Sequence, residues 1–121
     1  MTLKLHKICR IDELEDKRSI GMRLNYQDKE FDVFVVHKDG DYFAYLNRCP
    51  HTGVNLEWQA DQFLNRSGEW IQCSLHGALF QIDNGLCHHG PCVGDSLISL
   101  DCMTQDEWVM IDLNSLQNLQ I

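Results

Sequence analysis

Two short segments, Cys49-Pro50-His51-Thr52-Gly53 and Cys73-Ser74-Leu75-His76-Gly77, decide how this chain is organised. Each pairs one cysteine with one histidine, as C-x-H in the first and C-x2-H in the second, and each ends in glycine. The two ligand pairs are separated by a spacer, residues 52–72. Two thiolates and two imidazoles at such spacings are typical of a metal-ligand set. The sequence therefore predicts a metal centre held between two loops.

Length and composition place the chain among ordinary globular proteins. Its 121 residues are enough for a single domain, residues 1–121, and for a core of its own. A hydrophobic content of 44% and a charged content of 23% are usual for a soluble protein. The net charge of -8 argues against a nucleic-acid partner, which would require a basic surface. An acidic surface favours solubility, or docking onto a basic partner.

The sequence contains no apolar run long enough to span a membrane, so no membrane partner is expected. Residues 1–10 lack the charged start, apolar core and cleavage site of a signal peptide, and we expect a cytoplasmic protein. In that reducing compartment cysteines act as metal ligands or buried thiols rather than in disulfides. The chain has six: Cys9, Cys49, Cys73, Cys87, Cys92 and Cys102.

Short apolar or alternating runs predict an all-β fold of the sandwich or barrel type. Candidate strands occupy residues 3–8, 20–24, 31–37, 42–46, 70–73, 79–83, 97–102 and 108–113. Asp39-Gly40 predicts a tight hairpin turn, and 97–102 is expected to pair with 108–113 around residues 104–106. The two ligand segments then form a small cluster-binding lobe, approximately residues 47–94, on a β base. Residues 11–18 read as a loop or a helical turn, and the last residues as a short helix or a frayed tail.

Zinc is one interpretation of the ligand set, and it would make the protein a zinc-stapled interaction module. Structural zinc sites, however, usually combine C-x2-4-C with H-x3-5-H or a second cysteine pair. Here each pair mixes the two ligand types. Cys49 and His51 stand at alternate positions and could reach two different metal atoms. This arrangement suits a dinuclear centre in which one iron takes both sulfurs and the other both nitrogens.

The two segments resemble the signature of the Rieske [2Fe–2S] family, and the similarity extends over roughly residues 3–112. Leu79-Phe80-Gln81-Ile82, Asp83-Asn84-Gly85 and Gly90-Pro91 are similar to the family's strand, its turn and the Gly-Pro loop that covers the cluster. The spacer is longer than in the commonest family form. The resemblance implies one [2Fe–2S] cluster per chain, with one iron bound by Cys49 and Cys73 and the other by His51 and His76.

The resemblance also implies a reduction potential at the low end of the Rieske range. High-potential members carry a disulfide at positions that are Val54 and Leu75 here, and cluster-directed hydroxyls at positions that are Ala78 and Phe80. Fewer hydrogen bonds to the cluster leave its reduced state less stabilised. We therefore expect a potential of about -150 mV or somewhat above.

Cys87-His88-His89-Gly90-Pro91-Cys92 invites a second metal site, since the spacing of His89 and Cys92 would allow one. The covering loop is the better interpretation, with Cys92 as a small buried residue. Cys9 and Cys102 fall in strand-like runs and are expected in the core. Trp58 is an anchor of the spacer or a contact for a docking partner.

No G-x-S-x-G motif, phosphate-binding loop or dinucleotide fingerprint is present, so the expected protein is not an enzyme. The favoured function is a soluble one-electron carrier, passing electrons from a reductase to a terminal oxidoreductase or oxygenase. The alternative is a small cluster-bearing subunit of a larger oxidoreductase, similar to the small subunit of nitrite reductase.

Overall fold

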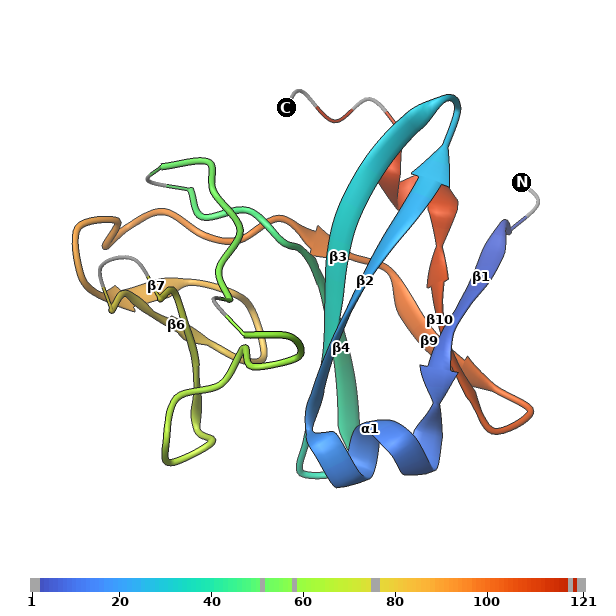
Figure 1. The fold of residues 1–121 in the computed structure, drawn as a ribbon, viewed down its shortest axis with the longest axis horizontal. Helices are drawn as coiled ribbons and strands as arrows, with labels where there is room; N and C mark the ends of the chain where they lie inside the picture. Colours follow the sequence, from blue (N-terminus) through green and yellow to red (C-terminus); the bar gives the residue numbers. More distant parts are fainter. Residues whose placement is uncertain (1–2, 51, 58, 75–76, 118, 120–121) are drawn as a thin grey trace.

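A computed structural model describes residues 3–50, 52–57, 59–74, 77–117 and 119, which form three antiparallel sheets (Figure 1). The elements are β1 (Leu5–Arg10), α1 (Ile11–Lys17), β2 (Ser19–Tyr26), β3 (Lys29–Lys38), β4 (Asp41–Leu46), β5 (Trp70–Gln72), β6 (Leu79–Gln81), β7 (Cys87–His89), β8 (Ser99–Leu100), β9 (Cys102–Gln105), β10 (Trp108–Asp112) and the 3-10 helix η1 (Leu113–Leu116). The prediction of an all-β fold is confirmed.

The sheets divide between a base and a lobe. Sheet A has the order β1-β10-β9 and sheet B the order β2-β3-β4-β8, and together they form the base. Sheet C, β5-β6-β7, belongs to the lobe, residues 47–94, which lies beside sheet B at the left of Figure 1. Sheet B therefore stands between sheet A and the lobe.

The middle of β3 is buried on both faces, which explains its continuous apolar run. Val33 and Val35 point into the core of the base, whereas Phe34 and Val36 point into the core of the lobe. All four are fully buried. A strand covered on both sides has no solvent face to fill with polar residues, so its sequence loses the alternation of a half-buried strand.

Tight turns join β2 to β3 and β3 to β4. Asp39 and Gly40 have φ values of 54° and 82°, and Gln27 and Asp28 have φ values of 52° and 65°. Positive φ at both central residues is the backbone of a type I′ turn, whose twist matches that of the flanking strands. The hairpin predicted at Asp39-Gly40 is confirmed, with Lys38 paired to Asp41.

The predicted closing hairpin is wrong in its first strand. Within residues 97–102, β8 pairs with β4 in sheet B instead of with β10. The chain then crosses to sheet A, where β9 pairs with β10 around Asp106 and Glu107, both at positive φ. Residues 104 and 105, expected in the turn, are the end of β9. Apolar alternation continues through the crossing, so the pattern cannot reveal the change of sheet.

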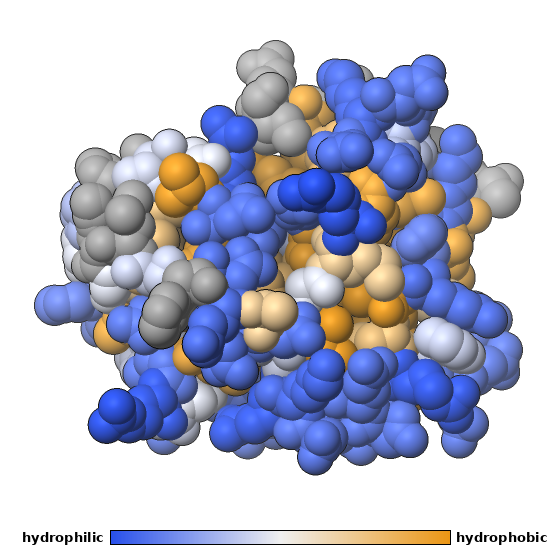
Figure 2. Space-filling view, in the orientation of Figure 1, coloured by the Kyte–Doolittle hydropathy of each residue, from blue (hydrophilic) through white to orange (hydrophobic). Residues whose placement is uncertain are grey.

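Short helices close the two ends of the base. α1 ends at Lys17 and is capped by Arg18, whose left-handed backbone lets its N–H donate to the Leu14 carbonyl at 2.6 Å. The Leu14 side chain is fully buried. For the last residues a short helix or a frayed tail was expected, and the structure shows the single turn η1, which buries Leu116. No helix in the described residues is long and apolar enough to cross a membrane. On the face in Figure 2, hydrophilic side chains cover α1 at the bottom of the view.

Candidate metal centre

The first ligand loop leaves the end of β4 and turns back on itself at Cys49. The Cys49 N–H donates to the Val54 carbonyl at 2.7 Å, and the Gly53 N–H donates to the Cys49 carbonyl at 2.8 Å. Gly53 has a φ of +77°, which side-chain-bearing residues rarely adopt. The two hydrogen bonds fix a tight loop around one buried cysteine.

The second ligand loop, between β5 and β6, repeats this pattern. The Cys73 N–H donates to the Ala78 carbonyl at 2.9 Å, and the Gly77 N–H donates to the Cys73 carbonyl at 3.0 Å. Gly77 also has a positive φ, of +65°. Two loops of different sequence thus form the same hydrogen-bonded turn, each with a cysteine at its first position.

The two cysteines are brought together in one hydrophobic cluster, where Cys49 is 3% and Cys73 0% exposed. Buried thiols on matched turns fit the sulfur half of a Cys2His2 iron–sulfur ligand set. His51 and His76 lie outside the described residues, as do Leu75 and Trp58, so the full ligand set remains a prediction. In the described part of the chain, no three cysteine, histidine or acidic side chains form a metal-binding group.

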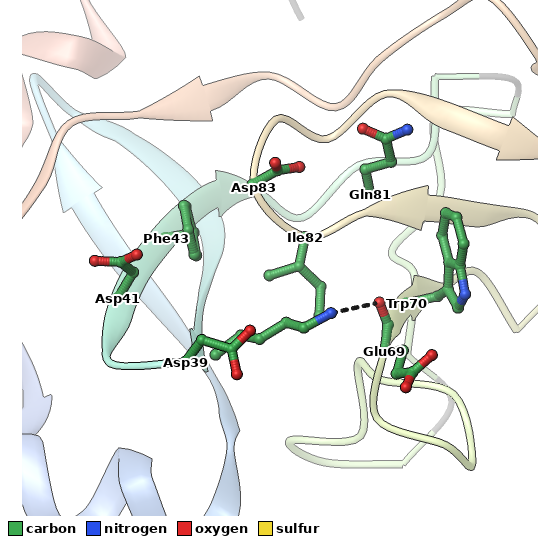
Figure 3. Close-up of a pocket in the computed structure, with 9 residues that line it drawn as sticks. Asp39, Asp41, Phe43, Glu69, Trp70, Gln81, Ile82 and Asp83 are labelled. Atoms are coloured by element: carbon green, nitrogen blue, oxygen red, sulfur yellow. Dashed lines mark hydrogen bonds between the residues drawn. The ribbon is translucent and has the colours of Figure 1, made fainter.

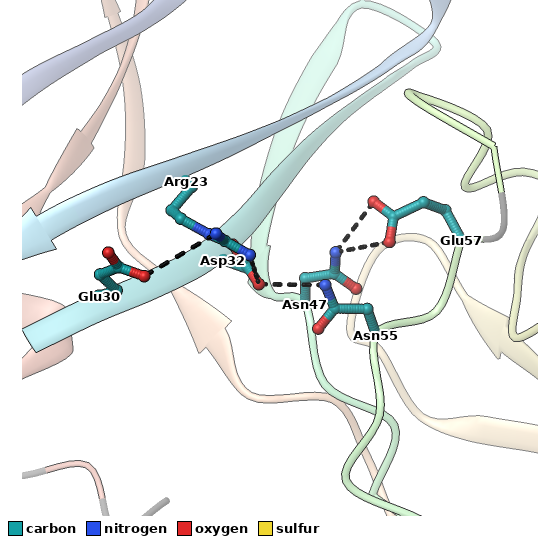
Figure 4. A network of polar contacts seen from close by, with 6 residues as sticks. All are labelled: Arg23, Glu30, Asp32, Asn47, Asn55 and Glu57. Atoms are coloured by element: carbon teal, nitrogen blue, oxygen red, sulfur yellow. Dashed lines mark hydrogen bonds and ion pairs between the residues drawn. The ribbon is translucent and has the colours of Figure 1, made fainter.

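Asn47 joins the two ends of the first ligand loop (Figure 4). The sequence pattern did not indicate this role. Its side-chain oxygen accepts from the Leu56 N–H at 2.8 Å, and its amide nitrogen lies 3.0 Å from both carboxylate oxygens of Glu57. Its own N–H donates to the Asp32 carbonyl at 2.8 Å. Asn47 is only 5% exposed, so these bonds satisfy a buried amide and hold both ends of the loop.

A second set of polar contacts ties the loop to the base. The Arg23 Nε lies 2.8 Å from Asp32, and the Asn55 amide donates to the same carboxylate at 3.0 Å (Figure 4). The hydrogen bond from Arg23 is the main reason that the pKa of Asp32 is lowered. Because Arg23 is exposed, this ion pair contributes little to stability.

The spacer between the ligand segments packs on sheet B. Asp61 accepts from the Gly21 N–H at 2.8 Å and from the Lys17 ammonium at 3.2 Å, and its carbonyl accepts from the Ser19 hydroxyl at 2.7 Å. The Phe63 ring stacks on Phe34 with the ring centroids 4.3 Å apart. The spacer therefore anchors the lobe to the base. This role is visible only in the tertiary contacts and could not be predicted from the sequence.

A cover loop, residues 90–95, follows β7 and lies against the second ligand loop. A Cβ atom on Gly90, whose φ is +111°, would stand 2.9 Å from the Ala78 Cα, so only glycine allows this approach. Cys92 is 2% exposed, as expected of a small buried residue. His88 is exposed and stacks on the Trp70 ring at 4.9 Å.

The junction between base and lobe is fixed by Tyr45, whose hydroxyl donates to the Ile82 carbonyl at 2.5 Å. Burial raises the pKa of Tyr45, which keeps the donor protonated. A groove of about 440 Å³ lies beside this junction (Figure 3). The Lys38 ammonium lies 3.5 Å from the Glu69 carbonyl across it. Of the candidate ligands that the structure describes, neither Cys49 nor Cys73 lines this groove.

Comparisons with known proteins agree on one family. The model of the Rieske [2Fe-2S] domain matches residues 4–110. The biphenyl dioxygenase ferredoxin subunit of Pseudomonas sp. (strain KKS102) is 27% identical over 79 residues, which is 65% of this chain and 65% of that relative.

Two solved structures have a similar fold over most of their length. The ferredoxin of carbazole 1,9a-dioxygenase from Nocardioides aromaticivorans IC177 has a TM-score of 0.69 at 19% identity, covering 90% of this chain and 97% of its own. The Sphingomonas yanoikuyae B1 ferredoxin has a TM-score of 0.63 at 25% identity, covering 90% and 98%.

Proposed function

Because the chain belongs to the Rieske [2Fe–2S] domain family, we propose that it is a one-electron carrier serving an oxygenase or another terminal oxidoreductase. The observation that carries this proposal is the pair of matched loops that bury Cys49 and Cys73 in one hydrophobic cluster. The relatives that are named as ferredoxins of dioxygenases support the same function. The donor is a reductase, and the chain is a carrier rather than an enzyme.

The proposed ligand set is Cys49 and Cys73 for one iron and His51 and His76 for the other. A bound Rieske [2Fe–2S] cluster accepts and releases one electron at a potential between about -150 and +300 mV. The chain's own residues hold the loops rigid, because the Cys49 and Cys73 backbones are each clamped by two hydrogen bonds. Rigid ligands limit the rearrangement that accompanies a change of charge.

The surroundings of the proposed centre support a low potential. Ala78 and Phe80 are 1% and 0% exposed, and neither side chain carries a hydroxyl. Val54, at the end of the first loop, is 44% exposed and contains no sulfur for a bridge between the loops. Fewer donors beside the cluster stabilise its more negative, reduced state less.

Redox titration of the purified holoprotein tests this function. We expect a red-brown protein that takes up one electron reversibly near the low end of the Rieske range, about -150 mV. A midpoint above about +150 mV would overturn the low potential. A colourless protein that binds zinc and takes up no electron would overturn the carrier function and favour the zinc-stapled module.

A cluster-bearing subunit of a larger oxidoreductase is the alternative arrangement. A permanent subunit interface needs an extended apolar surface. Among the described residues, the large hydrophobic side chains that are exposed are Leu3, Val54, Leu86, Val93 and Ile98. Purification from the native host discriminates the two arrangements, because a permanent subunit brings its large partner with it and a carrier elutes alone.

The proposal places this carrier in the cytoplasm, as one domain of residues 1–121 with its cluster in the lobe. None of the six cysteines, all of which lie within the described residues, forms a disulfide in the structure, as is usual in a reducing compartment. Cell fractionation with a tagged chain measures this directly, and recovery in a secreted fraction would contradict it.

A further inference from the structure

Two buried thiols that the electron-carrier function does not use face each other beside the cover loop. Cys87 is the first residue of β7, and Cys92 follows Gly90-Pro91 in the cover loop. Their Sγ atoms are 2.9 Å apart. The Cys92 thiol donates to the Cys87 sulfur, and the Cys87 thiol donates to the His89 carbonyl at 3.5 Å. Both side chains are 2% exposed.

The backbone already holds these sulfurs within reach of a covalent bond. The Cys87 N–H donates to the Asp95 carbonyl at 2.8 Å, and the Asp95 N–H donates to the Cys92 carbonyl at 2.9 Å. These bonds close the turn on both cysteines. A disulfide needs an S–S distance of about 2.05 Å, so the two sulfurs must approach by less than about 1 Å. Small side-chain rotations can supply such a movement.

We infer that Cys87 and Cys92 form a reversible dithiol–disulfide couple, a second redox site whose state is transmitted to the cluster through the cover loop. Small disulfides of the glutathione class are the oxidants that fit this exchange chemistry. The thiol chemistry is independent of the proposed function. The effect on the cluster rests on that function.

The position of the pair makes it a sensor for both ligand loops. Gly90, between the two cysteines, lies directly on Ala78, whose carbonyl accepts the N–H of Cys73. Cys49 of the first loop and Cys92 belong to the same buried hydrophobic cluster. A change in the bonding of Cys87 and Cys92 therefore alters the packing next to both proposed sulfur ligands.

The exchange proceeds in two balanced steps. One cysteine thiol loses its proton and attacks the small disulfide, forming a mixed disulfide and releasing one small thiolate. The second cysteine then loses its proton and attacks the mixed disulfide, forming the Cys87–Cys92 bond and releasing the other thiolate. The protein loses two electrons and two protons, and the small disulfide gains them as two thiols.

Burial makes this exchange slow. Burial, followed by the hydrogen bond with Cys87, raises the pKa of Cys92 to about 12, so its thiolate is scarce at neutral pH. The flanking side chains of Leu86, His88 and Val93 are exposed, and local opening of this surface loop gives the oxidant access. The couple thus follows a sustained change in the surrounding thiol–disulfide balance, rather than each turnover of the cluster.

To test this inference, the holoprotein is equilibrated under anaerobic conditions in buffers with increasing ratios of oxidised to reduced glutathione. Acid quenching, alkylation of the remaining thiols and peptide mapping then locate the disulfide. Titration of the cluster in the fully reduced and fully oxidised forms measures the coupling. Cys87→Ser and Cys92→Ser are the test variants, and Cys102→Ser, in β9 of the base, is the matched control.

We expect a disulfide linking Cys87 to Cys92, present in the wild type and Cys102→Ser and absent from both test variants. At a fixed applied potential, the ratio of reduced to oxidised cluster should differ by about twofold or more between the two thiol forms. Full alkylation of Cys87 and Cys92 in the most oxidising buffer would overturn the couple. Identical cluster titrations of the two thiol forms would show that the state of the couple is not transmitted to the cluster.

Peptide mapping of the wild type shows whether the Cys87–Cys92 disulfide forms, even where a variant fails to fold. Peptide mapping needs no cluster, so it still reports on the thiols of a protein that binds no iron. A failure of the proposed function, seen as loss of the cluster signal, is therefore distinct from a failure of the thiol couple.

Discussion

At the scale of single residues, the account depends on two cysteines and on the amide that closes the loop around one of them. Removing the thiol of Cys73 takes away one of the two buried sulfur ligands that we propose. We expect Cys73→Ala to lose nearly all of its iron, whereas Cys102→Ala, a substitution in β9 of the base, retains it. Iron analysis of the purified variants measures the difference. Two irons per chain in Cys73→Ala would remove this cysteine from the ligand set.

Asn47 offers a test of the neck that holds the first ligand loop. Asn47→Ala leaves the buried Leu56 N–H and the Glu57 carboxylate without their partner. We expect the free energy of unfolding to fall by about 1–3 kcal/mol. Asn55→Ala is the matched control, because the Asn55 amide is exposed and its loss should cost less than about 0.5 kcal/mol. Chemical denaturation of both variants gives the comparison, and equal losses would contradict this role of Asn47.

The sequence revealed site residues whose partners are close in the chain and missed those whose partners are distant. The two Cys/His pairs could be recognised because their ligands lie close together in the chain. Asn47 and Asp61 could not, because their partners come from other segments: Asn47 contacts Glu57 and Asp61 contacts Gly21. Nothing in the local pattern distinguishes such a residue from any other polar loop residue.

At the scale of elements, the cover loop depends on a close backbone approach at Gly90. Gly90→Ala introduces a Cβ only 2.9 Å from the Ala78 Cα, in addition to the strain of a positive φ. Gly94→Ala carries a similar strain at a φ of +99°, but its Cβ would meet no atom within 4 Å. We expect Gly94→Ala to lose about 1–2 kcal/mol of stability, and Gly90→Ala to lose more.

The rate of iron release from the cluster provides a second comparison of the Gly90→Ala and Gly94→Ala variants. If the cover loop protects the ligand loops, Gly90→Ala releases its iron faster to a chelator than Gly94→Ala does, as followed by the decay of visible absorbance. Equal release rates would mean that contact with Ala78 does not shield the centre.

Elements were predicted well where turn chemistry and apolar pattern agree. The Asp39-Gly40 turn fixes β3 and β4 in register, so both strands follow from the sequence. Residues 97–102 differ, because their alternating side chains suit pairing with either β4 or β10. The choice depends on the crossing between sheets, where the Asp112 N–H donates to the Asp101 carbonyl at 3.0 Å.

At the scale of the whole molecule, two hydrophobic cores share sheet B, and the base carries its own titratable thiol. Burial raises the pKa of Cys9 to about 12, from an ordinary value of 9.0. Below about pH 9 the thiol is protonated in both the folded and the unfolded chain, and its stabilising effect is complete. As the pH rises from about 9 to 12, only the unfolded chain ionises, and stability is lost.

This difference predicts a steeper alkaline loss of stability in the wild type than in Cys9→Ala. The expected contribution is up to about 1.4 kcal/mol per pH unit in that window. Unfolding at a series of pH values compares the slopes, which the cavity left by the substitution does not change. Parallel slopes above pH 9 would show that Cys9 is not a buried thiol in the folded protein.

The central claim is that Cys49 and Cys73 hold one iron and His51 and His76 the other. Pulsed EPR of the reduced holoprotein, labelled with 15N-histidine, tests it most directly, because only iron-bound imidazole couples strongly to the unpaired electron. The account predicts a Rieske-type spectrum with couplings from two histidine nitrogens, and the loss of one coupled nitrogen in each single histidine variant that retains iron. A reduced cluster without strong nitrogen coupling would indicate four thiolate ligands and contradict the account.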